Sequence, residues 1–87
     1  MVNTTSLREV ARRLRRTRLA LGYESQAGFA RVIDTKVSRY NQYETGERLI
    51  TLDVALRITE RFGVTLDWIY RGDASGLPRR IDVAGEG

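Results

Sequence analysis

The side chains with the most chemistry to offer are amides, hydroxyls and cations gathered between residues 36 and 48. Ser38 and Gln42 are four residues apart, which puts them on one face of a helix. A Gln amide can bond bidentately to the edge of adenine, and a Ser hydroxyl can donate to or accept from either kind of base pair. Lys36 and Arg39 can reach guanine or phosphate, and we expect phosphate for Arg39 because phosphates take most such contacts. Groups of these kinds are able to hydrogen-bond to the bases and phosphates of a nucleic acid.

Catalysis and metal binding find little support in the composition. The chain has neither His nor Cys, which removes the commonest metal ligand and general base together with thiolate chemistry. The remaining candidates are carboxylates, hydroxyls and Lys36, and no paired set of them lies on a recognisable scaffold. We therefore expect no enzyme activity, no metal and no cofactor.

The chain has 87 residues, a length that corresponds to one domain. Its basic residues are unevenly distributed. Residues 1–48 carry ten basic and five acidic side chains, whereas residues 49–87 carry five and six. All but one of the cations are Arg, whose planar guanidinium suits phosphates and base edges. We expect the basic partner surface in the first half, although a merely solvated surface would have the same charge.

Neither a membrane nor a secretory route is indicated. No apolar run approaches the roughly 20 residues that a membrane span needs. The first residues, MVNTTSLREV, lack the basic and apolar regions of a signal peptide. We expect a cytoplasmic protein that does not associate with membranes.

Polar caps and glycines divide the chain into helices, so the expected fold class is all-α. Ser6 and Glu9 have the spacing of a capping box, and Ser25, Thr51 and Thr65 are further N-cap candidates. Gly22, Gly46, Gly63 and Gly72 mark helix ends. The expected helices cover residues 7–21, 26–33, 36–43, 52–62 and 66–71.

Apolar spacing predicts the buried face of each of the first four helices. The expected core positions are Leu7, Val10, Leu14 and Leu21, then Phe29, Ala30 and Ile33, then Val37, Tyr40 and Tyr43, and finally Leu52, Ala55, Leu56, Thr59 and Phe62. Arg12, Arg13 and Arg16 point away from the first stripe and are expected in solvent. Arg18 falls inside it, so it either has an acidic partner or extends its charged end to water.

The segment after residue 72 has a different composition, dominated by Gly, Ser and Pro. We divide the chain into a domain over residues 1–72 and a tail over residues 73–87. The tail is expected to be a linker or an adaptable arm.

The stretch QAGFARVIDTKVSRYNQYETG, residues 26–46, resembles the helix-turn-helix of the phage repressor and Cro family, also called the Xre-like family. The preceding RLRRTRLALGYESQ resembles the family's first helix, and LDVALRITERFGVTLDWIYRGD resembles its fourth and fifth. The resemblance covers roughly residues 7–73. It implies a five-helix lambda-repressor-like DNA-binding domain that acts as a transcriptional regulator, most simply a repressor.

The resemblance also implies which residues touch DNA. The third helix would enter the major groove, Gln26 would meet the DNA backbone at the start of the second helix, and Arg48 would clamp the backbone. Val37 would either meet a thymine methyl or be a partly buried packing residue. The expected DNA-binding residues are Gln26, Thr35, Lys36, Val37, Ser38, Arg39, Asn41, Gln42 and Arg48.

Inside the domain, the resemblance pairs Arg18 with Glu44. This chain also departs from the family pattern at three positions. Asp34 occupies the turn where Gly is usual in a left-handed conformation, which Asp tolerates better than most residues. Gly28 replaces a frequent acidic residue. Lys36 stands at the usual capping position, so the cap of the third helix is expected to fall to Thr35 or Asp34.

The expected partner is double-stranded DNA, bound by a two-fold homodimer at an inverted-repeat operator, because one short helix contacts too few base pairs for specificity in a genome. Dimerisation is expected through Trp68, Ile69, Tyr70, Leu77 and Ile81, although the first four could equally belong to a partner surface or the core. A monomer that pairs only on DNA is the alternative. Other functions left open are an antitoxin that also binds a toxin or effector protein, and an interaction module without DNA affinity.

Overall fold

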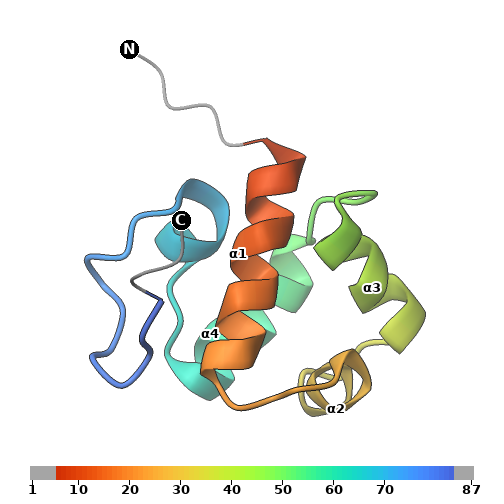
Figure 1. The fold of residues 1–87 in the computed structure, drawn as a ribbon, viewed down its shortest axis with the longest axis horizontal. Helices are drawn as coiled ribbons and strands as arrows, with labels where there is room; N and C mark the ends of the chain where they lie inside the picture. The colour runs from red at the N-terminus through yellow and green to blue at the C-terminus, as the bar shows by residue number, and fades with distance from the viewer. Residues whose placement is uncertain (1–5, 84–87) are drawn as a thin grey trace.

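A single long helix separates two groups of elements in the computed structural model, which describes residues 6–83. Helix α1 (Leu7–Ala20) lies between the pair α2 (Gln26–Val32) and α3 (Val37–Thr45) on one side and the C-terminal elements on the other (Figure 1). Helix α4 (Leu52–Phe62) lies behind α1, and η1 (Asp67–Arg71) is one turn of π-helix. All five elements are helical, which confirms the predicted fold class.

The caps predicted at Ser6, Ser25, Thr51 and Thr65 are present. Glu9 N donates to Ser6 Oγ at 3.1 Å and Ser6 N donates to Glu9 Oε1 at 3.1 Å, which completes the capping box of α1. The hydroxyls of Ser25 and Thr51 accept from backbone N–H groups in the first turns of α2 and α4. Thr65 Oγ1 accepts from Trp68 N at 3.0 Å, so this hydroxyl caps the last helical turn. These bonds satisfy N–H groups that have no partner within the helix.

The core is built around Phe29, which is fully buried. Its ring centroid lies 5.4 Å from those of Tyr23 and Tyr40 and 5.7 Å from that of Phe62. Val10, Leu14, Ala30, Ile33, Tyr40 and Tyr43 are buried as predicted. The aromatic cluster joins α2, α3 and α4, so it fixes the angle between the first two.

The predicted apolar faces of α4 and α1 are wrong in part. In α4 the buried residues are Val54, Ala55 and Ile58, whereas Leu52 and Leu56 are 56% and 38% exposed. Both sides of α4 carry apolar residues, so spacing alone cannot decide which one packs. Leu7 is exposed because it is the first residue of α1, beyond the reach of the core.

The C-terminal region differs most from expectation. Trp68, Ile69, Ile81 and Val83 all belong to the core, being at most 8% exposed, and Leu77 packs partly against it. The interpretation of residues 77–83 as a linker or arm is therefore wrong. The predicted dimer surface is also wrong, because the monomer buries Trp68, Ile69 and Ile81 and partly buries Tyr70 and Leu77. The structure instead agrees with the alternative that assigned the residues of this surface to the core. The boundary at residue 72 stays a prediction, and residues 84–87 lie outside the described part.

Helix α1 holds the C-terminal region through side-chain bonds. Trp68 Nε1 donates to the buried Thr17 Oγ1 at 2.8 Å. Arg13 Nε donates to Ile69 O at 3.2 Å, and its guanidinium lies 5.9 Å from the centre of the Trp68 ring. Arg13 and Arg16 are half-buried rather than solvated, and only Arg12 of the predicted trio is exposed.

Within residues 6–83, no helix has the length and apolar character to cross a membrane.

Candidate nucleic-acid interface

The turn between α2 and α3 sets the direction of the second helix. Asp34 has φ 56°, the left-handed conformation expected at this position. Thr35 N donates to Ala30 O at 3.0 Å, which closes the turn against α2. Ala30 is itself 1% exposed, so a larger side chain would push α2 and α3 apart.

Arg57 of α4 braces the same turn. Its guanidinium donates to the carbonyl oxygens of Ile33 and Asp34, and it also pairs with Asp53 Oδ2 at 2.7 Å. Carbonyls at a helix C-terminus lack helical partners and carry partial negative charge, so a cation stabilises them. Sequence reasoning missed this role. The spacing of Asp53 and Arg57, four residues apart on one helix, was the available signal.

Helix α3 begins one residue later than expected. Lys36 occupies the N-cap position and makes no side-chain capping bond, so the expected cap by Thr35 or Asp34 is wrong. An ammonium group has no lone pair with which to accept from a backbone N–H. Gly46, with φ 86°, ends the helix.

The two sides of α3 differ sharply in burial. Tyr40 and Tyr43 are at most 1% exposed. The opposite side carries most of the predicted DNA-binding residues, with Lys36, Val37, Ser38, Arg39 and Asn41 exposed and Gln42 partly buried. Val37 is 46% exposed, so its interpretation as a packing residue is wrong and its contact with thymine stays a prediction. Thr35 is partly buried at the turn.

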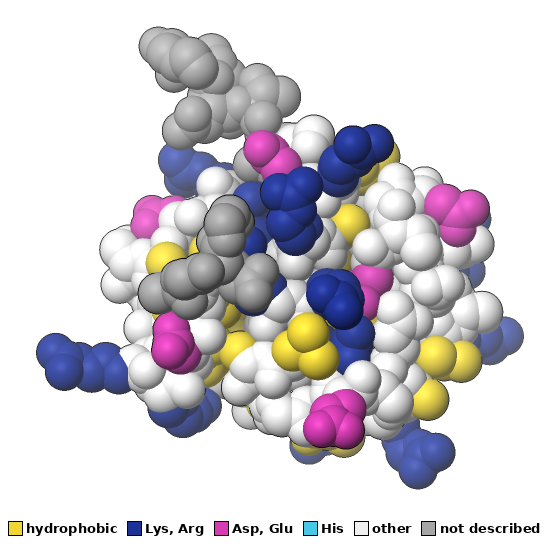
Figure 2. All heavy atoms as spheres, viewed as in Figure 1, with side chains coloured by type: hydrophobic (Ala, Val, Ile, Leu, Met, Phe, Trp, Pro, Cys, Tyr) yellow, Lys and Arg dark blue, Asp and Glu magenta, His cyan; other side chains and the backbone are white. Residues whose placement is uncertain are grey.

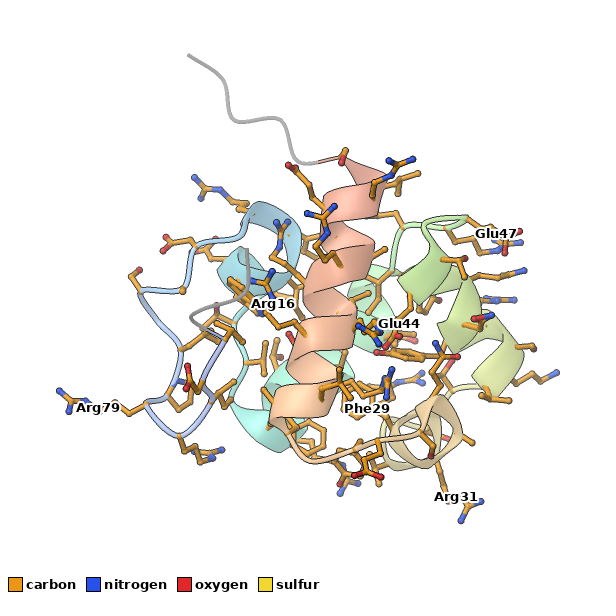
Figure 3. All side chains as sticks on the ribbon, viewed as in Figure 1. Arg16, Phe29, Arg31, Glu44, Glu47 and Arg79 are labelled. Carbon is orange, nitrogen blue, oxygen red and sulfur yellow. The ribbon has the colours of Figure 1, made fainter. Side chains whose placement is uncertain are left out.

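The predicted pair between Arg18 and Glu44 is present and buried. Arg18 Nε donates to Glu44 Oε2 at 2.8 Å and Nη2 donates to Oε1 at 3.2 Å, and the two side chains are 5% and 3% exposed. Figure 3 shows Glu44 pointing from α3 toward α1. Arg18 Nη1 also donates to the carbonyl oxygens of Tyr23 and Glu24, at 2.9 and 2.8 Å. One guanidinium thus joins α1, the loop before α2 and the end of α3.

The pair changes the acidity of the groups around it. Burial by itself would raise the pKa of Glu44, but the hydrogen bonds from Arg18 and Gln26 and the positive charge of Arg18 help to leave that pKa below its ordinary value. The hydrogen bonds to Glu44 raise the pKa of Arg18. Burial, reinforced by the Glu44 carboxylate, raises the pKa of the Tyr40 hydroxyl. The site therefore holds a charged pair beside a neutral phenol at neutral pH.

Gln26 connects this network to the surface. Its Nε2 donates to Glu44 Oε1 at 3.0 Å, and its side chain is partly buried at the start of α2. The alternative of a surface Gln that contacts nothing is therefore wrong. An amide nitrogen carries a second hydrogen, which keeps the expected contact with a phosphate open as a prediction.

A shallow hollow lies beside the start of α3. Ala27, Ala30, Arg31, Asp34, Thr35, Lys36 and Val37 line it. Arg31 projects from α2 away from the body of the molecule (Figure 3). Sequence reasoning did not select Arg31, although its place in the last turn of α2 puts a cation on the same edge as Lys36.

A second group of cations lies over α1. Arg8, Arg12 and Arg15 are exposed, and their spacing puts them along one side of the helix. Figure 2 shows Lys and Arg side chains gathered over α1 in this view. The basic surface predicted for the first half of the chain is therefore divided between α1 and the edge formed by α2 and α3.

Comparison with known families agrees with this geometry. The HTH_3 helix-turn-helix family model matches residues 14–69, more than half of the chain. Searches of curated proteins and of solved structures gave no significant match. The chain belongs to the phage repressor and Cro-type helix-turn-helix family, and it is a DNA-binding regulator in general terms.

Proposed function

We propose that this protein is a sequence-specific transcriptional repressor that places α3 in the major groove of an operator. The observation that carries the proposal is the contrast between the two sides of α3. Glu44 and two tyrosines fix one side, while Ser38, Asn41 and Gln42 present hydroxyl and amide groups on the other. Groups held in this way can hydrogen-bond to base edges without reorganising the helix.

Cations around α3 supply the affinity that does not depend on sequence. Lys36 is exposed at the start of α3, and Arg39 is exposed one turn further along the helix. Each phosphate neutralised by such a side chain releases counterions, so binding weakens as salt rises. Phosphate contacts by Lys36 and Arg39 in each of two copies, four in all, predict a slope of about −4 for log affinity against log salt.

Two copies on an inverted repeat are the expected arrangement. We place the contact between them at Leu49, Leu52 and Leu56, which are 49%, 56% and 38% exposed. Leu52 and Leu56 lie one turn apart on α4, and Leu49 lies three residues after Gly46. A second copy docked there would lie close to the end of α3. The two α3 helices would then lie about 34 Å apart on one face of the duplex.

Selection of bound fragments from random duplexes tests the function. We expect an enriched motif with two-fold symmetry, and repression of a reporter gene that carries it. Titrations at several salt concentrations against scrambled duplex then give the slope and the preference. Binding without sequence preference, or an affinity that does not change with salt concentration, would contradict the proposal.

A further inference from the structure

Arg48 and Gln42 are joined by two hydrogen bonds. Arg48 Nε donates to Gln42 Oε1 at 2.8 Å. Arg48 N donates to Gln42 O at 3.2 Å, and Thr45 Oγ1 donates to the same carbonyl at 3.2 Å. The chain after α3, near the residue labelled Glu47 in Figure 3, thus folds back onto Gln42. The guanidinium of Arg48 is held beside the amide that the sequence selected for reading bases.

This contact decides which atoms of Gln42 are available. A guanidinium nitrogen can only donate, so the amide atom that it meets is the oxygen. The Gln42 Nε2 group, with its two hydrogens, is the other end of the amide. Bidentate bonding to adenine would need Oε1 to accept from the adenine amino group. Oε1 already gives one of its two lone pairs to Arg48, whose remaining donors would face that amino group and oppose the contact.

A paired Gln42 and Arg48 therefore offer mainly donors. The free groups are Gln42 Nε2 and the terminal Arg48 nitrogens, all of which carry hydrogens. In the major groove, adenine presents one acceptor beside one donor, whereas guanine presents two acceptors, N7 and O6. A surface made of donors matches guanine.

We infer that Gln42 and Arg48 act as one unit that recognises guanine, with Arg48 as the positioning residue for the Gln42 amide. The inference rests on the proposed function, because α3 must lie in the major groove. It replaces the adenine contact expected for Gln42 and the backbone clamp expected for Arg48. Both substitutions are then expected to affect the same base pair.

The test uses the duplex motif recovered by selection with the full chain. Gln42→Ala and Arg48→Ala are each expected to lose about tenfold discrimination at one G·C pair. Arg48→Lys keeps the charge but lacks Nε–H, so it is expected to lose the same discrimination while keeping the salt slope. Replacing that guanine with 7-deazaguanine removes the N7 acceptor and is expected to weaken wild type more than either alanine variant. Arg39→Ala is the matched control and should weaken all duplexes alike.

Separate results would overturn the inference and the proposed function. Adenine at the Gln42 position, or effects of the two variants at different base pairs, would overturn the inference alone. A random pool that shows no enrichment would overturn the proposed function and the inference with it. Thermal melts of each variant confirm that loss of discrimination is measured on folded protein.

Discussion

The two sides of α3 differ in burial and in the kind of contact that they can make. On the inner side, Glu44 accepts hydrogen bonds from Arg18 and Gln26, and Tyr40 and Tyr43 are buried. On the outer side, Ser38 and Asn41 are exposed. The inner side fixes where the helix lies, and the outer side decides what it can bind. Substitutions should therefore separate into those that alter stability and those that alter specificity.

Removing the inner pair is expected to have the largest effect. Arg18→Ala or Glu44→Ala leaves one buried charge without its partner, which should lower the free energy of unfolding by about 3–5 kcal/mol. A loss of this size is comparable to the whole stability of a small domain. Denaturant titration of each variant measures it.

Asp67→Ala is the matched control for that experiment. Asp67 and Arg71 also form an ion pair, at 3.5 Å, but their side chains are 61% and 74% exposed. Exposed pairs contribute about 0–1 kcal/mol, so this variant should unfold almost like wild type. Equal losses in the buried and exposed pairs would show that burial of Arg18 and Glu44 does not matter.

Glu44 on the inner side should also make the free energy of unfolding depend on pH in the acidic range. The pKa of Glu44 in the folded protein lies below its ordinary value of 4.5. A lowered pKa contributes stability above the ordinary value and loses it as pH falls through the folded value. Each such group adds at most about 1.4 kcal/mol per pH unit to the slope.

Glu44→Gln removes this carboxylate and should flatten the acid dependence of the free energy of unfolding. Asp73, whose pKa is lowered first by a backbone hydrogen bond from Ser75, titrates in both proteins and serves as an internal background. Unfolding titrations between about pH 3 and 7 provide the comparison. Parallel curves for wild type and variant would contradict the role of Glu44.

The turn between the two helices should respond more weakly. Asp34 has a φ of 56°, which costs most residues about 1–2 kcal/mol but Asp somewhat less. Asp34→Gly is expected to raise the free energy of unfolding by about 0.5–1 kcal/mol, and Asp34→Val to lower it. If Asp34→Val melts at or above wild type, the left-handed conformation is not required.

The outer side should give the smallest change in stability. Ser38 is exposed and makes no contact with the core, so Ser38→Ala should change the free energy of unfolding by less than about 0.5 kcal/mol. Its effect is expected in base preference instead. A loss of stability as large as that of Glu44→Ala would abolish the distinction between the two sides.

Local signals were enough to predict most of the fold. Ser6 with Glu9, and Gly46, act within a few residues, so their roles can be inferred from spacing. The pairing of Arg18 with Glu44 spans 26 residues. The apolar stripe predicted either an acidic partner for Arg18 or a charged end in water, and the family resemblance favoured Glu44 as the partner.

Tertiary contacts explain what was missed. Ile81 and Val83 belong to a segment with no helical spacing, so only the folded chain reveals that they complete the core. The role of Arg57 depends on carbonyls 23 and 24 residues away. The bond between Arg48 and Gln42 depends on how the turn after α3 closes, and no pattern in the sequence indicates it.

Binding of the double variant Ser38→Ala, Gln42→Ala to the selected duplex and to a scrambled one tests most directly whether the outer side of α3 recognises DNA. Both residues lie on that side, and neither contributes to the core. We expect the variant to melt like wild type and to bind the scrambled duplex equally well, while losing most of the preference for the selected one. A variant that keeps the wild-type preference would contradict recognition by this face.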